Sequence, residues 1–550
     1  MAISRRSMML GTAAGGAAMT LAACSGDDGG DGDGGGNGGA GGGGVILLNG
    51  TEPQNPLHTL NTNEVGGGRI LDNIYSKLVH YSPEGEPENE MAESIETEDS
   101  QNFTITIADG WTFTNGDPVT AQSFVDAWNY GANGANGQYA SSFFEAIEGY
   151  ADISDADADP EATLSGLEVV DDLTFTVTLS SPQADFPVRL GYTAFSPLPQ
   201  AFFDDPEAFG ESPIGNGPYQ LVEWNHNQNA VLEVNPDYAG PRTPANDGLE
   251  FVFYQDQETA YNDLLSGGLD VIDQIPPSAL SSFESELGDR AINQPVAVND
   301  TITIHMEDPN FSGEAGTLRR QAISHAINRA EICEQIFAGT REPMTDFTTP
   351  VMNGYSDSIP GNEVLEFDEA KAKELWEQAE EIQPFEGAFT ISYNADGGHQ
   401  EWVDALANSV SNVLGIEASG NSYPDFKSLR DEVTDRTMEG AFRTGWQSDY
   451  PSMFNFLSAL YTTASAEGRG SNDGDYMNPE FDEALGEALS ATEDEESFSL
   501  GQQAQEILFE DLPAIPLWFR NVAAGYADTV EDVVFSWNSQ PVWHQISKLS

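Results

Sequence analysis

The spacing of hydrophobic residues changes repeatedly along this chain, and this is the strongest constraint on its fold. Alternation of apolar and polar residues, the period of a half-buried strand, occupies residues 101–113 and 171–179. Recurrence every three to four residues, the period of a helix with one buried face, occupies residues 119–131, 318–337, 367–381 and 404–415. A further buried strand is expected from Val45. Strands interspersed with helices favour α/β or α+β layers, and 550 residues are enough for two or more lobes.

The charge of the chain excludes one large class of partners. There are 20 Lys and Arg against 91 Asp and Glu, which gives a formal net charge of -71. Such a field repels phosphate backbones, and the basic stripe that nucleic-acid binding requires is missing. We therefore expect no nucleic-acid partner. Because the acidic residues accompany regular periodic segments, they indicate a solvated surface rather than a disordered chain.

The first residues have the features of an export signal. Arg5 and Arg6 precede an apolar run, residues 8–20, that is too short to span a membrane, and small residues lead to Cys24. This pattern resembles a bacterial lipoprotein signal, and the arginine pair suggests the twin-arginine route. By that resemblance, residues 1–23 are a signal peptide and a lipid on Cys24 anchors the chain to the outer face of the cytoplasmic membrane. The alternative is an ordinary secretory signal followed by an accidental cysteine.

Residues 24–44 are expected to tether a folded body. Ser25 to Gly44 is dominated by glycine and contains nothing to bury, so it behaves as a flexible coil of about 25 Å root-mean-square length. Cys333, the second cysteine, falls on the apolar face of a predicted helix. If Cys24 carries lipid, no disulfide is available, and the sequence contains no zinc-type cysteine cluster.

Common enzyme and metal motifs are absent from the sequence. It contains no G-x-S-x-G, P-loop or H-E-x-x-H pattern, and its seven histidines are scattered singly. Asp155, Asp157 and Asp159 have the alternating spacing of a calcium loop, but Pro160 and Gly166 occupy the positions that need glycine and glutamate. An acidic turn is the better interpretation. We expect no catalytic residue, no metal and no cofactor.

The segment "AFRTGWQSDYP", residues 441–451, points to a binding function. Its composition indicates an extended segment that stops at Pro451, so Arg443, Gly445, Gln447 and Asp449 project to one side. Arg443 and Asp449 are about 20 Å apart on such a strand. A cation and an anion separated by exposed backbone complement a short zwitterionic peptide that binds as an added strand. The alternative is a surface strand with unrelated charges.

Short phrases in a fixed order extend this interpretation to most of the chain. They are "NGTEPQNPL", "TFTNGDPVTAQSFVDAW", "IGNGPYQLVEW", "LRRQAISHAINRAEI", "DEAKAKELWEQA", "GWQSDYP" and "LPAIPLWF", spread over residues 45 to 540. With these phrases the chain resembles the extracytoplasmic solute-binding proteins of bacterial ABC importers, in the peptide-binding family 5 that includes oligopeptide- and dipeptide-binding proteins.

The resemblance implies an α/β fold of the periplasmic-binding-protein type, with two lobes, a hinge and an extra inserted subdomain. Lobe I would comprise residues 45–64, 193–297 and 518–550, with the insert at 65–192, and lobe II would comprise residues 298–517. It also implies a monomeric receptor, not an enzyme, that passes short peptides to an ABC permease with its ATPase subunits.

The resemblance also assigns roles to individual residues. Asp449 matches the partner of the ligand's α-amino group, and Gly445 and Gln447 match positions whose backbone pairs with the peptide. The segment that matches the other side of the peptide is Glu52, Pro53 and Gln54, although Pro53 has no N–H to donate.

Further matches concern the peptide's carboxylate and side chains. Arg443 and His399 match residues that contact the carboxylate. Tyr423, Arg430 and Tyr139 match pocket residues, and Trp446 belongs either to the pocket or to the core. The presence of Asp449 favours a peptide ligand. One alternative is a receptor for a nickel chelate, an opine or an oligosaccharide. Another, from a different class, is a secreted enzyme or a peptide sensor on the same fold.

Overall fold

One eleven-stranded sheet connects most of the structure. The computed structural model describes residues 43–62 and 64–549, so the predicted signal peptide, Cys24 and most of the predicted tether lie outside the described residues. The strands follow the order β15, β14, β16, β12, β17, β11, β1, β10, β9 and β8, and β13 also pairs with β17. Their bounds are β1 Val45–Gly50, β8 Tyr219–Asn225, β9 Asn229–Val234, β10 Gly248–Phe253, β11 Val271–Ile272, β12 Ala291–Ile304, β13 Arg341–Pro343, β14 Phe389–Asn394, β15 Ala418–Tyr423, β16 Ala441–Gln447 and β17 Ala514–Tyr526.

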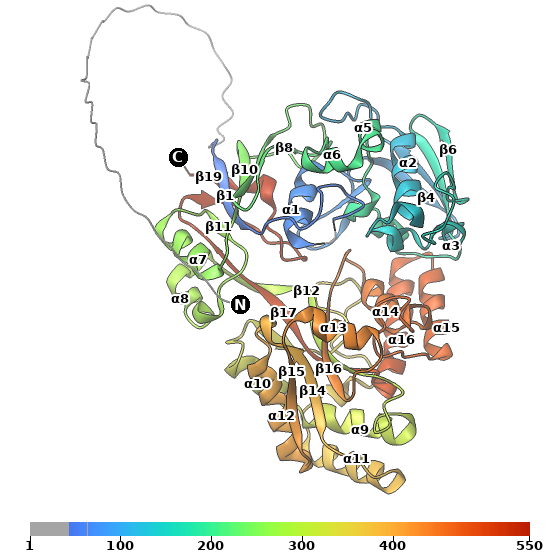
Figure 1. Cartoon of the computed structure of the whole chain (residues 1–550), viewed down its shortest axis with the longest axis vertical. Helices are drawn as coiled ribbons and strands as arrows, with labels where there is room; N and C mark the ends of the chain where they lie inside the picture. Colours follow the sequence, from blue (N-terminus) through green and yellow to red (C-terminus); the bar gives the residue numbers. More distant parts are fainter. Residues whose placement is uncertain (1–42, 63, 550) are drawn as a thin grey trace, which may run out of the picture. The chain divides into compact units, whose positions relative to one another are not determined.

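The long strands β12 and β17 join the two halves of this sheet and run side by side (Figure 1). At one end Ala291–Pro295 pairs with Asn521–Gly525, and at the other end Asn299–Thr303 pairs with Ala514–Phe519. Between Pro295 and Asn299 the register shifts, and Pro295 has no N–H for the ladder. The interrupted ladder is where a hinge between two lobes can bend.

A separate four-stranded antiparallel sheet lies within the range predicted for the inserted subdomain. Its order is β4, β5, β7 and β6. The bounds of its strands are β4 Ala92–Thr97, β5 Asn102–Ile107, β6 Leu167–Asp171 and β7 Thr174–Thr178. Two short antiparallel pairs complete the strands, β2 Val79–Tyr81 with β3 Pro87–Asn89 and β18 Val530–Glu531 with β19 Ser547–Lys548.

The helices fall into two sets along the chain. The first set is α1 Val65–Ile74, α2 Ala121–Ala132, α3 Tyr150–Ile153, α4 Phe186–Arg189, α5 Gln200–Asp204, α6 Pro206–Glu211, α7 Gln257–Ser266 and α8 Phe283–Leu287. The second set is α9 Gly313–Ala326, α10 Arg329–Gln335, α11 Glu369–Ile382, α12 Gln400–Leu414, α13 Phe426–Thr434, α14 Met453–Tyr461, α15 Pro479–Ser490 and α16 Asp494–Asp511. None of the helices within the described residues is both long and apolar enough to cross a membrane.

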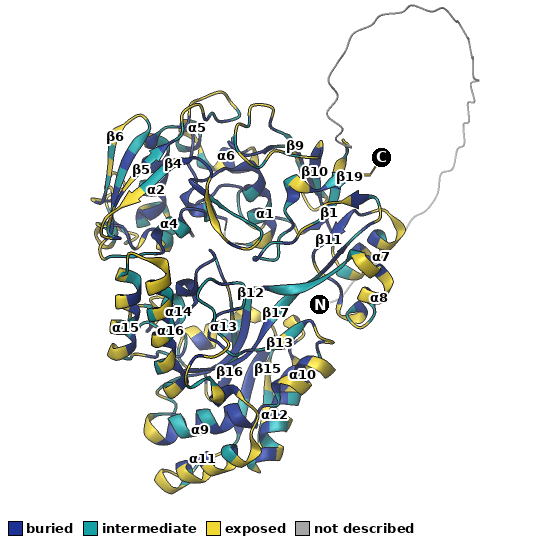
Figure 2. Cartoon of the chain, turned by 180° about the vertical axis from the view of Figure 1, so that it is seen from behind, coloured by how far each residue is buried: buried dark blue, intermediate teal, exposed yellow. Residues whose placement is uncertain are grey.

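Two large hydrophobic clusters correspond to two lobes. The first contains Leu48 of β1, Phe175 of β7 and Phe251 of β10, so the four-stranded sheet shares its core with the first half of the large sheet. The second contains Ile302 of β12 and Trp518 of β17 together with the helices around them. In Figure 2 the strands of the second half are mostly buried, whereas the outward faces of α11 and α15 are exposed. The residue boundaries of the lobes stay predictions.

Most of the predicted strands and helices are confirmed, although the strand predicted over residues 101–113 ends at Ile107. The helical spacing over residues 318–337 is divided between α9 and α10, because Asn328 leaves the helical conformation and its side chain accepts a hydrogen bond from the N–H of Glu331. Cys333 lies buried on α10, as its spacing predicted. A new helix can begin at Asn328 without disturbing the apolar face, so spacing alone does not reveal the break.

Buried Arg329 holds the junction of α9, α10 and β17 together. Its guanidinium donates to the carbonyl oxygens of Pro516, Leu365 and Ser324 at 2.7–3.0 Å. Arg329→Met should lower the free energy of unfolding by about 3 kcal/mol, because buried carbonyls lose their donors. Urea unfolding followed by tryptophan fluorescence measures this. The exposed change Lys373→Met on α11 should have little effect, and equal midpoints for the two variants would contradict the assigned role of Arg329.

Candidate functional site

Two cavities lie at strand β16 and share Gln447 in their walls. We call the first the arginine cavity; it measures about 380 Å³ and is lined by charged residues Asp300, Arg430, Arg443, Asp473 and Arg520 among others. We call the second the aspartate cavity; it measures about 390 Å³ and is lined by Asp449 together with residues of α1, Tyr192 and the loop around Trp537. The predicted cation Arg443 and the predicted anion Asp449 therefore face different cavities.

One edge of β16 is free over the residues that separate these two charges. On its other edge β16 pairs with β12 along its whole length, and beyond the strand the N–H of Ser448 donates to the carbonyl of Ala297. Successive residues direct their backbone groups to opposite edges, so those of Gly445 and Gln447 point away from β12. On that side β14 pairs only with Ala441 and Phe442. The wall of the arginine cavity thus includes an unpaired strand edge.

Gly445 occupies a position where a side chain does not fit. A Cβ atom built there would lie 2.6 Å from the carbonyl oxygen of Asn299 on β12. It would also lie 3.3 Å from Oδ1 of Asp300, so the Asp300 carboxylate stands next to this glycine. The glycine therefore permits the close approach of β16 to β12 and leaves the backbone accessible, since Gly445 is exposed.

Asp449 lies two residues beyond the end of β16, in the loop before α14. The strand ends at Gln447 rather than at Pro451, because Ser448 turns back to donate its hydroxyl to the carbonyl of Tyr450 at 2.6 Å. Asn455 of α14 fixes the loop: its side chain donates to Oδ2 of Asp449 at 3.1 Å and accepts from the N–H of Asp449 at 3.2 Å. Strand alternation therefore stops before Asp449.

The carboxylate of Asp449 is half-buried and has no cation beside it. Burial raises its pKa to about 6, and the hydrogen bond from Asn455 only partly opposes this. Among the described residues, no Lys, Arg or His forms an ion pair with it. Burial and then the nearby Asp449 carboxylate raise the pKa of Tyr192 across the cavity. The site has a place for a positive charge and does not fill it from its own side chains.

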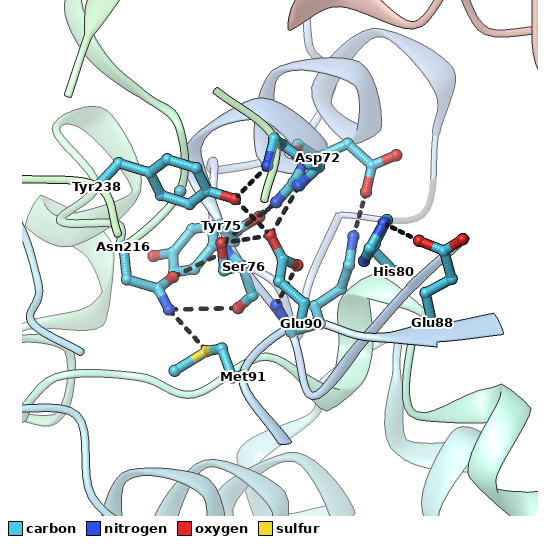
Figure 3. Close-up of polar contacts among 12 residues, drawn as sticks. Asp72, Tyr75, Ser76, His80, Glu88, Glu90, Met91, Asn216 and Tyr238 are labelled. Atoms are coloured by element: carbon cyan, nitrogen blue, oxygen red, sulfur yellow. Dashed lines mark hydrogen bonds and ion pairs between the residues drawn. The ribbon is translucent and has the colours of Figure 1, made fainter. Parts of the chain in front are cut away.

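The cations in the opposite wall of the aspartate cavity are already paired. Arg242 donates from Nε to Glu90 at 2.8 Å, and Glu90 also accepts from Tyr238 and Ser76, as Figure 3 shows. Although burial opposes it, Arg242 lowers the pKa of Glu90. Lys77 forms an ion pair with Asp72.

Arg69 of α1, the other cation in this wall, pairs with Asp273. Two acidic groups of the described wall then lack a cationic partner: Asp449 and Glu64, the N-cap residue of α1, which accepts from the N–H of Gly67.

The arginine cavity has the opposite polarity. Arg430 forms two hydrogen bonds with Asp473, at 2.5 and 3.0 Å. Asp300 accepts from Nε and Nη2 of Arg520 at 2.9 and 2.6 Å, and also from Arg341. Although burial opposes it, the two guanidinium groups lower the pKa of Asp300. The guanidinium of Arg443 lies 5.1 Å from the ring centroid of Phe426 on α13.

His399 provides no positive charge in this arrangement. It is buried, and burial together with Arg443 lowers its pKa to about 4. Its Nδ1 accepts from Nε1 of Trp402 at 3.1 Å, so the neutral ring carries its proton on Nε2 and can donate there. Trp446 lines the arginine cavity and donates from Nε1 to Asn455 at 2.7 Å, so it connects both cavities.

Neither cavity is lined by His399 or by the remaining predicted residues. Glu52 pairs with His226 at 2.9 Å on the surface, Pro53 is buried, and the N–H of Gln54 donates to Glu64 at 3.2 Å. Tyr423 donates to Glu432 at 3.1 Å. Tyr139 is 59% exposed. Their predicted roles stay predictions.

Several residues of the site carried no local signal in the sequence. Asp300 and Arg520 are 220 residues apart, and Tyr192 and Trp537 meet Asp449 only through the arrangement of the two lobes. Strand pairing between β12 and β17 brings the first two together, and no short motif records it.

The chain is similar to known proteins over most of its length. The family model for bacterial extracellular solute-binding proteins, family 5 Middle, matches residues 86–468. The dipeptide-binding protein DppE of Bacillus subtilis is 27% identical over 84% of each chain, and the oligopeptide-binding protein OppA of the same species is 26% identical over 87% of each. The structure of DppA from Helicobacter pylori, in complex with the peptide STSA, superposes with a TM-score of 0.75 at 20% identity, covering 93% of this chain and 99% of that one.

The raised pKa of Asp449 predicts that ionisation of this carboxyl group destabilises the unliganded protein. The unliganded native state binds a proton more tightly than the unfolded chain, so the contribution of Asp449 to stability falls as the pH rises from about 4 to about 6. Asp449→Asn should make the unliganded protein more stable at pH 7 by about 1–3 kcal/mol. The difference between the two proteins should shrink toward pH 4 in urea unfolding. A variant less stable than the parent at pH 7 would contradict this.

Proposed function

Because this chain belongs to family 5 of the bacterial extracellular solute-binding proteins, we propose that it captures short peptides and holds them by their free α-amino group at Asp449. The observation that carries this proposal is the half-buried Asp449 carboxylate, which lies beside a free strand edge and lacks a cationic partner among the described residues. An α-ammonium group supplies that charge and three hydrogen-bond donors. A solute without an amine leaves the carboxylate buried and uncompensated.

Hydrogen bonds between the backbone of β16 and the backbone of the peptide would hold the ligand. A peptide that begins at Asp449 and extends past Gln447 and Gly445 finds unpaired backbone groups on β16, as an added strand requires. Such pairing takes no account of side chains, so it suits a receptor for varied peptides. By resemblance, Arg443 contacts the peptide carboxylate, and neutral His399 contributes a hydrogen bond rather than a charge.

Both lobes contribute to the aspartate cavity, which supports closure around the ligand. Residues 62–81 and Tyr192 belong to the first hydrophobic cluster or pack against it, whereas residues 447–449 lie at the end of β16, which pairs with β12. A ligand that contacts both walls favours the closed state by the difference in its affinity for the two states.

The receptor would deliver its ligand to an ABC permease and perform no catalysis itself. The proposed permease and its ATPase subunits supply the energy, and lipid on Cys24, after export by the twin-arginine route, holds the monomer at the membrane. These assignments rest on the resemblance and on the family. DppE and OppA, named as peptide-binding proteins, support a peptide rather than another solute as the ligand.

Calorimetric titration tests the proposal directly. The domain without its anchor, stripped of carried-over ligand, is titrated with a pool of two- to six-residue peptides and with the same pool after N-acetylation. Only the free-amine pool should bind, and Asp449→Asn should weaken binding by about 3–5 kcal/mol, the cost typical of removing one partner from a buried ion pair.

The outer cation Lys427, which is 82% exposed on α13, gives the control for this titration. Lys427→Gln should bind peptides like the parent. If neither pool binds to the folded domain, the ligand is a non-peptide solute; if bound peptide is cleaved, the enzyme alternative holds.

The pKa of Asp449 also predicts how peptide affinity depends on pH. The free carboxyl titrates near pH 6, whereas a bound ammonium group lowers its pKa, so binding below pH 6 must expel a proton. The dissociation constant should rise by up to about tenfold per pH unit below 6, and rise again above about pH 8, where the α-amino group loses its charge. Affinities measured from pH 4.5 to 9 check this. An affinity that stays constant between pH 4.5 and 7 would rule out Asp449 as the amine partner.

A further inference from the structure

We propose that Arg520 forms a second anion-binding subsite in the arginine cavity and selects peptides that carry an acidic side chain at an interior position. This inference rests on the proposed function and adds the substrate class. It concerns a carboxylate other than the one at the end of the peptide.

The charge around Asp300 is the first support. Its single carboxylate accepts hydrogen bonds from Arg520, from Arg341 and from Nε1 of Trp518 at 2.9 Å. Two guanidinium groups therefore share one negative charge, and the group of three carries one net positive charge. Burial lowers the pKa of Arg341 to about 10, which leaves it charged at neutral pH, and Asp300 raises that of Arg520.

Arg520 is the member of this group that faces the cavity. Its side chain is 36% exposed and lines the arginine cavity, whereas Arg341 is 18% exposed and its guanidinium lies 4.0 Å from the ring centroid of Phe337. Arg520 directs Nε and Nη2 toward Asp300, so the hydrogen atoms on Nη1 are not used in that pair. Arg341 is thus held as a structural partner of Asp300, and Arg520 presents the excess charge.

The strand register places this charge beside the middle of a bound peptide. Asp300 pairs with Gly445 across β12 and β16, and with Trp518 across β12 and β17. Cross-strand partners share a face of the sheet, so Asp300 and Trp518 stand on the face where Gly445 has no side chain. Arg520, two residues after Trp518 on β17, shares that face and bonds to Asp300. Gly445 lies two residues before the end of β16, and Asp449 lies two residues beyond that end. A peptide with its amine at Asp449 therefore reaches this level at an interior residue.

Two arginines that pair with one aspartate are an unusual arrangement for so acidic a chain. Acidic residues outnumber basic ones by 91 to 20, yet two arginines converge here on one aspartate at the wall of a cavity. A carboxylate buried between two guanidinium groups needs only one of them for charge balance. A ligand carboxylate uses the second.

Matched tetrapeptides test the proposal. Tetra-alanine is compared with peptides that carry Glu or Gln at position 2 or 3, each with a free and an amidated C-terminus, by calorimetry on the parent domain. Glu should bind about tenfold to a hundredfold more tightly than Gln at one interior position, as expected for a hydrogen bond between two charged groups. The preference should be the same for the amidated peptides, because it concerns the side chain.

Variants locate the preference at Arg520. Arg520→Gln should reduce the ratio between Glu and Gln to within about twofold, while tetra-alanine still binds, because Asp300 retains Arg341 and Trp518. Arg520→Lys should restore part of the ratio. Lys427→Gln removes an equal charge from exposed α13 and should leave the ratio unchanged.

Each other result overturns the inference. Equal affinity for Glu and Gln, with tetra-alanine bound through its amine, leaves the proposed function standing and removes this subsite. A preference that survives Arg520→Gln, or that disappears on amidation, assigns the carboxylate to another group or to the peptide's end. Failure of every free-amine peptide to bind would overturn the proposed function and this inference together.

Discussion

The pairing of β12 with β17 is the constraint on which the rest of the structure depends. These strands belong to both hydrophobic clusters and connect the two halves of one sheet. Their register shift after Pro295 frees Ala297, whose carbonyl accepts from the N–H of Ser448 while its own N–H donates to Trp537 at 2.7 Å. The interruption of the ladder therefore also ties the segments that carry Asp449 and Trp537, two residues of the aspartate cavity, to the same residue of β12.

Electrostatics divide the site into two unlike ends. At one end, partial burial without a cation raises the pKa of Asp449 and makes its charged form unfavourable in the unliganded protein, a cost that the ammonium group of the proposed peptide would offset. At the other end, guanidinium groups gather in a chain that is otherwise strongly acidic. The free edge of β16 lies between these ends. This separation of charges matches the polarity of a peptide, and it arises from residues that are distant in sequence.

Much of the fold followed from periodicity, because burying one face imposes a period of two on strands and of 3.6 on helices. The division between α9 and α10 did not, since the cap at Asn328 preserves the apolar spacing on either side. Alternation also failed beyond Gln447, where hydrogen bonds of Ser448 and Asn455 direct Asp449 into a different cavity from Arg443. The neutral state of His399 depends on burial and on Arg443, which no local pattern expresses.

The sequence by itself determined the class of fold and the family, because these depend on local spacing and on short phrases in a fixed order. Only the tertiary structure decided which charges meet. Asp300, Arg341 and Arg520 come from three strands, and the pairing of those strands brings them to one point. Burial and the positions of counterions are properties of the folded protein. The pKa of Asp449 is therefore set by the tertiary structure and cannot be read from the residues beside it in the sequence.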